Sequence, residues 1–441
     1  MKATFHVCRF MLKTVFAIVL AMTSSAFAQK CVNPHFDAQR LDFRDLGYPG
    51  ATEIPADSSP ITALLAHSNG KVYGATSGKK SYLFAYDSRV NKVFPLGVLP
   101  EAQGVHGCLA EGKDGLIYIG TGKNEHEMLV LSRKMPEGRR AIENQLWADI
   151  ESRYAGYEGG HLYAYDTVKG DAEVYLEDAR AKVVDLGVPL PGESIYAMAM
   201  DAARGVVYGL GYPHAELFAF DIAKREVRKI GKWMTKLSYP GPERSWRGVP
   251  RALVVNADGV VWSSGDDGLL RFYDPRIGEF GETLMRIPGE YWETQAYNAF
   301  PVVEQLFVQA DGSLIGTTSD GFVFSAYPNV NRLLSWGKPR VERRVRAATV
   351  GKDGRLYMIC GEKDNVGRLF SFRSDEGHVD WGVLGVDRSP YYAKIAYQFD
   401  AMATAADGSV FIGESDRRAK LFIFIPGGEV MPGVLNPTNP R

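Results

Sequence analysis

Alternating apolar and polar positions divide the chain into short predicted strands separated by tight turns. Seven times an Asn, Asp or Arg followed by Gly leads into an alternating apolar strand; the turn glycines are Gly70, Gly115, Gly205, Gly259, Gly312, Gly354 and Gly408. This pattern is typical of a hairpin with a two-residue turn. Most hairpins begin with a small-apolar strand such as "RALVVN", and most are followed by an aromatic strand such as "YLFAYD". A fourth strand then ends in glycine, as in "KVFPLG".

Seven units of four strands predict an all-β fold, a seven-bladed β-propeller with four-stranded antiparallel blades. Most units recur about every 40 to 55 residues, and a six- or eight-bladed ring is the alternative. The last unit stops after "KLFIFI" and lacks a fourth strand, whereas "DFRDLG" at 42–47 matches the fourth strand "KVVDLG". We therefore expect an N-terminal strand to close the last blade, which would leave no unpaired edge in the ring.

The second unit is roughly twice as long as the others, which exceeds the usual blade length. The excess lies at about 132–158, where the spacing of Ile142, Leu146 and Ile150 predicts a short amphipathic helix. This insertion is either a loop that covers the edge of a blade or a lid over one face of the propeller.

The first 28 residues have the features of a secretory signal peptide. Three basic residues precede the apolar run "TVFAIVLAM", and "AFA" at 26–28 is a small-x-small cleavage site. We expect export with cleavage near Ala28, a secreted or periplasmic location, and one propeller domain over 29–441. The apolar run is short for a membrane span, so we expect none in the mature protein.

The composition limits which partners, disulfides and metal sites we expect. The formal charge of -1 argues against nucleic-acid binding, and we expect a monomer. The mature chain would keep Cys31, Cys108 and Cys360, which allows one disulfide and leaves one thiol. There is no CxxC or HExxH pattern, so the signal for a metal is weak and a structural metal stays an open question.

Propeller geometry predicts which residues share a face, because each inner strand starts on the face where the second strand ends. His106 opens the inner strand of the second blade and His126 follows its second strand; Tyr196 begins the inner strand of the third blade. By the same reasoning the candidates for substrate binding on this face are Tyr212, His214, Arg251 and Arg346.

Other charged residues are also expected on this face. The cations are Lys79, Lys80, Lys123, Arg344, Arg346, Arg417, Arg418 and Lys420, and the acids are Asp266, Asp267, Glu362, Asp364, Glu414 and Asp416. This basic surplus is either an ordinary solvated surface or a site for an anionic polymer, because Arg and Lys bind carboxylate and sulfate groups.

The residue types favour proton abstraction next to a carboxylate. We expect no carboxylate pair near the histidines, which disfavours glycoside hydrolysis by two acids, and there is no Gly-x-Ser-x-Gly motif. A cation would neutralise the carboxylate of a uronic acid and acidify the neighbouring proton. A His or Tyr would then remove that proton. This β-elimination needs no cofactor and no metal.

The layout resembles the propeller-type ulvan lyases, secreted polysaccharide lyases with two histidines at the ends of one blade's first hairpin and a catalytic Tyr on the next inner strand. The resemblance implies catalytic roles for His106, His126 and Tyr196. It also implies a carboxylate-neutralising Arg after the second strand of the third blade, where this chain reads "GLGYPHAEL" and has no Arg. His214 or Arg251 would then have that role, or the substrate differs, or catalysis is lost.

Each candidate also has a structural interpretation. His106 could be a hydrogen-bonded residue at the channel mouth, His126 a surface residue, and Tyr196 a packed inner-strand aromatic. The leading hypothesis is an exported lyase that acts on a uronate-containing, sulfated polysaccharide such as ulvan. The alternative is a non-catalytic periplasmic propeller that binds an anionic glycan or a protein. A lactonase-like enzyme is disfavoured, because no cluster of metal ligands occurs on the inner strands.

Overall fold

The structure is a computed structural model, and it describes most of the chain from residue 54 onward. The described residues are 31–32, 54–90, 92–124, 148–171, 180–234, 249–289, 301–340, 345–360, 367–386, 394–395, 398–415 and 419–426.

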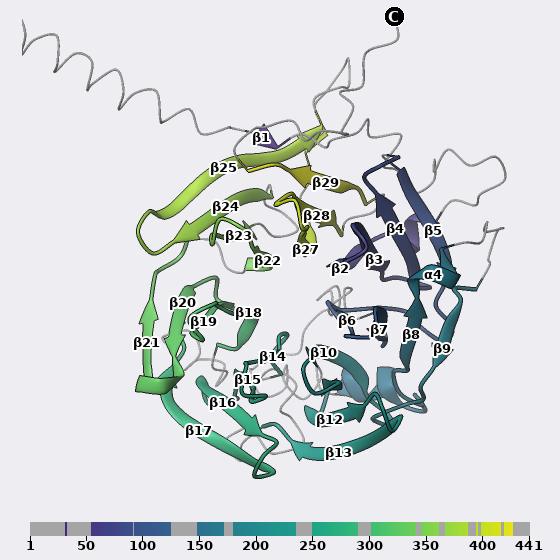
Figure 1. Ribbon diagram of the computed structural model, residues 1–441, viewed down its shortest axis with the longest axis horizontal. Coiled ribbons are helices and arrows are strands. Elements are labelled where there is room, and N and C mark those ends of the chain that lie inside the picture. The colour runs from purple at the N-terminus through teal and green to yellow at the C-terminus, as the bar shows by residue number, and fades with distance from the viewer. Residues whose placement is uncertain are drawn as a thin grey trace, which may run out of the picture.

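Seven β-sheets stand around a central axis within these residues, which confirms the predicted seven-bladed propeller (Figure 1). Strands follow one another from the axis outward. The first three blades contain β2 (Ile61–Ala66), β3 (Lys71–Thr76), β4 (Tyr82–Asp87), β5 (Lys92–Val98), β6 (Leu109–Glu111), β7 (Leu116–Gly120), β8 (Leu162–Asp166), β9 (Val183–Asp185), β10 (Ser194–Asp201), β11 (Val206–Tyr212), β12 (Glu216–Asp221) and β13 (Glu226–Lys232). A short helix, α4 (Thr167–Gly170), follows β8.

The other four blades repeat this arrangement. Their strands are β14 (Val254–Val255), β15 (Val261–Ser264), β16 (Leu269–Asp274), β17 (Glu279–Arg286), β18 (Val303–Val308), β19 (Leu314–Thr318), β20 (Val323–Tyr327), β21 (Arg332–Ser335), β22 (Val345–Val350), β23 (Leu356–Cys360), β24 (Arg368–Arg373), β25 (Gly377–Val386), β27 (Phe399–Thr404), β28 (Val410–Glu414) and β29 (Leu421–Phe424). β26 (Lys394–Ile395) pairs with the end of β25. Neighbouring strands within each blade are antiparallel.

The first strand that the structure describes lies beside the last two blades. β1 (Cys31–Val32) pairs in parallel with β25 on the outside of the sixth blade and also contacts β29 of the seventh, as Figure 1 shows at the outer edge of the ring. The N-terminal strand therefore lies against the last blades, as expected. The particular segment predicted for this role, 42–47, lies outside the described residues. Ile61 and Phe84 of the first blade share a hydrophobic cluster with Phe411 and Leu421 of the seventh.

Aromatic side chains from second and third strands fill the spaces between blades. The rings of Tyr86 and Phe411 are 5.4 Å apart across the closure of the ring, and those of Tyr357 and Phe424 are 5.7 Å apart between blades six and seven. Large aromatic residues bury much apolar area and favour tilted contacts of this kind. The aromatic strands in the sequence thus provide the packing that fixes one blade against the next.

The insertion in the second blade is described in part. Residues 148–154 are helical, and Ile150 is buried. The Tyr154 hydroxyl lies 2.8 Å from Ser194 Oγ at the start of β10, so this segment packs against the face where the inner strands begin. The rest of the predicted helix, with Ile142 and Leu146, lies outside the described residues. Among the helices that the structure describes, none has the length and apolar character of a membrane-spanning segment.

Candidate functional site

Five inner strands contain a β-bulge near their first residue. The extra residue has no partner on the second strand of its blade, and these residues are Thr62, Tyr196, Glu304, Arg346 and Asp400. A bulge redirects the side chain of the extra residue out of the regular alternation. All five side chains line one pocket at the central axis.

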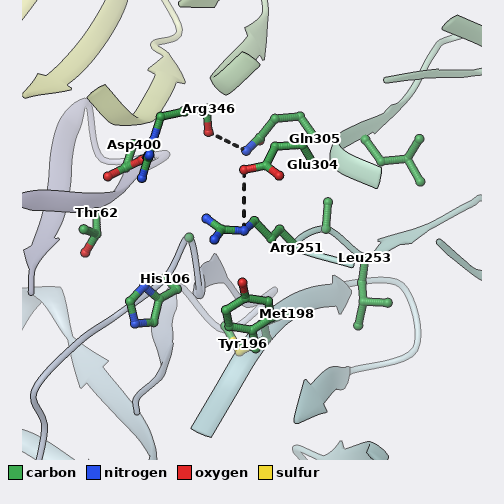
Figure 2. Close-up of a pocket in the computed structure, with 13 residues that line it drawn as sticks. Thr62, His106, Tyr196, Met198, Arg251, Leu253, Glu304, Gln305, Arg346 and Asp400 are labelled. Carbon is green, nitrogen blue, oxygen red and sulfur yellow. Dashed lines mark hydrogen bonds and ion pairs between the residues drawn. The ribbon is translucent and has the colours of Figure 1, made fainter. Parts of the chain in front are cut away.

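The other two blades place a polar residue in the same pocket. In the fourth blade Arg251 precedes β14, and in the second blade His106 and Gly107 precede β6. Gly107 has a φ of +67°, a left-handed conformation that glycine adopts readily. All seven blades therefore contribute to this pocket, which has a volume of about 170 Å³ and is drawn in Figure 2.

Tyr196 is fixed by rings on two sides and by a cation. Its ring centroid lies 4.8 Å from that of Tyr212 and 6.2 Å from that of His106. The guanidinium carbon of Arg251 lies 5.5 Å from the Tyr196 centroid, within the range of a cation–π contact. Tyr196 is only 7% exposed, and in Figure 2 its hydroxyl points toward the Arg251 guanidinium.

His106 is oriented by the backbone of the neighbouring strand end. Its Nε2 lies 2.9 Å from the carbonyl oxygen of Lys123. A carbonyl can only accept a hydrogen bond, so Nε2 must carry the proton. In a neutral His106 the lone pair is then on Nδ1. This fixes the tautomer that any proton transfer by His106 would use.

Arg251 is a cation held beside a buried carboxylate. Its Nε lies 3.5 Å from Glu304 Oε1, and the Glu304 side chain is 2% exposed. Burial acts to lower the pKa of Arg251, but the nearby acidic groups, Glu304 first and then Tyr196, Asp400 and Tyr212, together raise it above its usual value. Arg251 therefore stays charged. Figure 2 shows its two terminal nitrogens directed away from Glu304, toward the middle of the pocket.

A second ion pair lines the opposite side of the pocket. Arg346 Nε lies 2.5 Å from Asp400 Oδ1, and Gln305 Nε2 donates to the Arg346 carbonyl at 3.1 Å. The pocket thus contains two guanidinium groups and two carboxylates. The expectation from the sequence of no carboxylate pair near the histidines is wrong for His106, because Glu304 and Asp400 line the same pocket. Each of the two carboxylates lies beside an arginine.

The structure brings four of the seven candidate residues together and places two others outside the pocket. His106, Tyr196, Arg251 and Arg346 line it. Tyr212 is buried behind Tyr196. His214 is half exposed, with Nδ1 3.6 Å from Glu193 Oε1. The remaining candidate, His126, lies outside the described residues.

Sequence reasoning missed Thr62, Glu304 and Asp400, although a signal for them exists. Each of these three residues stands eight positions before the turn glycine of its blade, and so do Arg251 and Arg346. The pairs are Thr62 and Gly70, Glu304 and Gly312, Asp400 and Gly408, Arg251 and Gly259, and Arg346 and Gly354. A polar residue at this fixed offset interrupts an otherwise apolar inner strand. Comparison of this one position across the repeats would have identified five of the pocket residues.

The described residues contain no group of three or more His, Cys, Asp or Glu side chains placed to bind a metal ion. Cys108 and Cys360 are buried free thiols, so they do not form the disulfide that the sequence allows between them. The side chain of Cys31 is outside the described part of the structure.

Known proteins resemble the chain in fold and not in sequence. No protein-family model matches it, and no curated protein matches it. A streptogramin B lyase structure shares 13% identity at a TM-score of 0.55 and covers 85% of this chain and 96% of its own. Virginiamycin B lyase from Staphylococcus aureus shares 10% identity at 0.54, covering 83% and 95%. The extracellular domain of a putative one-component system from B. thetaiotaomicron shares 10% at 0.50, covering 83% of this chain but 39% of its own. At these identities the likeness establishes the propeller fold alone.

Proposed function

We propose that the protein is a lyase that cleaves a uronate-containing polysaccharide by β-elimination in the axial pocket. The observation that supports this proposal is the convergence of Tyr196, His106 and Arg251, from three consecutive blades, on one pocket. These three residue types supply a proton acceptor, a second proton-transfer group and a cation, which together are the requirements of the reaction. The pocket's small volume suits a single sugar residue, with the rest of the polymer lying across the face.

The proposed reaction breaks one C–H and one C–O bond. Arg251 contacts the carboxylate at C5 of the uronate and stabilises the negative charge that develops as the C5 proton leaves. That proton passes to Tyr196 or to His106. The electron pair forms the C4–C5 double bond, the C4–O4 bond breaks, and O4 leaves with a proton from the other member of the pair. The reaction consumes no water and needs no oxidant or reductant.

Three polymers and four proteins test this proposal. Ultraviolet absorbance of the unsaturated product would be followed with ulvan, alginate and polygalacturonate. Tyr196→Phe and His106→Ala should each lower kcat by about 10²- to 10⁴-fold, the contribution of a positioned acid or base. Tyr208→Phe is the matched control, because it removes a buried hydroxyl from the same blade, at a residue that does not line the pocket. Equal activity of all four proteins, or no absorbance change with any polymer, would contradict the proposal.

One observation favours the alternative of a non-catalytic binding propeller. Both arginines of the pocket already lie beside carboxylates, Arg251 beside Glu304 and Arg346 beside Asp400. A substrate carboxylate would therefore have to share Arg251 with Glu304. Polymer binding without any absorbance change, in wild-type protein and in Glu304→Gln alike, would support the binding alternative.

A further inference from the structure

A second pocket lies beside the axial one, between the first two blades. It has a volume of about 470 Å³ and is lined by the loop between β3 and β4, by the connection from β5 to β6, and by the end of β7. These segments are on the face where the inner strands begin, which is also the face of the axial pocket. Tyr157, from the insertion of the second blade, completes the wall.

This second pocket has a strong excess of positive charge. Lys79, Lys80, Lys123 and Arg180 line it, and Glu101 is the one carboxylate among its described lining residues. In the described parts of the chain, neither Lys79 nor Arg180 forms an ion pair with an acidic side chain. Clustered charges of one sign in a concave site raise the local concentration of the oppositely charged ligand. The axial pocket, by contrast, has balanced charges.

Lys123 connects the two pockets. Its ammonium group lies 4.6 Å from the ring centroid of Tyr157, and both residues line the second pocket. Its carbonyl oxygen accepts the hydrogen bond from His106 in the axial pocket, and its backbone N–H donates to Ser194 Oγ at 2.9 Å. One residue thus contributes its side chain to the basic pocket and its backbone to the orientation of a candidate catalytic group.

We propose that the basic pocket is an anion-binding subsite that takes a sulfate or carboxylate group of the same substrate, on a sugar next to the one in the axial pocket. The identity of this substrate rests on the proposed function. Three lysines and one arginine among the lining residues suit a sulfate or carboxylate, because hydrogen bonds to charged oxygens are stronger than neutral ones. Binding there would keep two neighbouring sugars of the polymer aligned with the two pockets, which Lys123 connects, so that the uronate enters the axial pocket.

The test measures equilibrium binding in a background without turnover. Ulvan and chemically desulfated ulvan would be titrated into Tyr196→Phe protein by calorimetry, with and without Lys79→Ala and Arg180→Ala. The matched control is Lys113→Ala with Lys352→Ala. Both lysines are exposed and lie in turns between first and second strands, on the opposite face. Lys79 and Arg180 are also exposed, and thermal unfolding would confirm that every variant is folded.

Loss of the two cations should weaken ulvan binding by about 10- to 100-fold, since one good charged contact is worth roughly tenfold. The opposite-face control should bind like the parent. A loss confined to sulfated polymer assigns the pocket to sulfate, and an equal loss with both polymers assigns it to carboxylate. Lys79→Arg with Arg180→Lys should retain most of the affinity. Binding by the Lys79→Ala, Arg180→Ala protein within about twofold of the control would overturn the inference.

This result can be separated from failure of the proposed function. If wild-type protein produces no absorbance change, the elimination reaction is disproved. A loss of binding specific to Lys79 and Arg180 would still support an anion subsite in a non-catalytic propeller. In an active enzyme, the same variant should raise KM and leave kcat nearly unchanged, because it removes binding that the ground state and transition state share.

Discussion

Tyr196 and Arg251 occupy equivalent places in neighbouring blades, and the Arg251 guanidinium carbon lies 5.5 Å from the centre of the Tyr196 ring. One comes from the bulge of β10 and the other precedes β14. The pair is therefore produced by the repeat itself, because each blade directs one residue of its inner strand to the axis. A change of that residue therefore alters the chemistry of the pocket directly.

Removing one partner of the Arg251–Glu304 ion pair should destabilise the protein more than removing both charges. Arg251→Met leaves a nearly buried carboxylate without its guanidinium, so we expect the free energy of unfolding to fall by about 3 kcal/mol. Arg251→Met with Glu304→Gln should recover most of that loss, because no buried charge remains. Urea unfolding of the two single variants and the double variant gives the coupling energy. Additive effects would contradict this account of the pair.

The aspartates at the ends of third strands should contribute to stability in a pH-dependent way. Hydrogen bonds from Arg89 hold the pKa of Asp87 below its usual value. Its contribution is therefore complete above the unfolded-state pKa of about 3.9 and is lost as the pH falls through the lower folded-state value.

Asp87→Asn should reduce the difference in unfolding free energy between pH 7 and pH 2 by up to about 1 kcal/mol. Asp221 and Asp274 have lowered pKa values for related reasons, namely hydrogen bonds from Lys224 and Arg276. The corresponding Asn variants should therefore change acid stability in the same direction. An unchanged pH dependence in Asp87→Asn, measured by urea unfolding, would show that Arg89 does not perturb the folded carboxylate.

The two buried thiols should be unreactive in the folded protein. Cys108 and Cys360 are free and buried, and burial raises the pKa of Cys108 above its usual value. Alkylation needs the thiolate, so neither residue should be labelled until the protein is denatured. Peptide mass spectrometry after alkylation in buffer and in guanidinium chloride checks this. Labelling of Cys108 in buffer would show that the inner strand of the second blade opens readily.

A glycine faces a phenylalanine across the second and third strands of several blades. Gly74 pairs directly with Phe84, and Gly209 pairs with Phe218. A methyl group on Gly74 would overlap the Phe84 ring, so Gly74→Ala should lower the unfolding free energy by about 1–3 kcal/mol. Phe84→Leu in the same chain should reduce that penalty, since the smaller side chain leaves room. Equal penalties in both backgrounds, by chemical denaturation, would contradict the contact.

The sequence by itself determined the architecture, because the information for it is local and repeated. A tight turn at Gly312 and the apolar alternation after it define a hairpin whatever the rest of the chain does. Seven copies of the pattern cannot bury their aromatic third strands except against one another, so they form a ring. The same patterns placed His106, Tyr196, Arg251 and Arg346 on one face, and these four residues line the axial pocket.

Only the tertiary structure decided which charges meet. Glu304 is far in sequence from Arg251, and Asp400 is far from Arg346; each pair forms because neighbouring blades bring equivalent positions together at the axis. Likewise, His214 is near Tyr196 in sequence, but the strand end that carries it places it outside the pocket. Strand pairing is encoded within each blade, whereas contacts at the axis depend on how blades pack around it. No local pattern specifies that packing residue by residue.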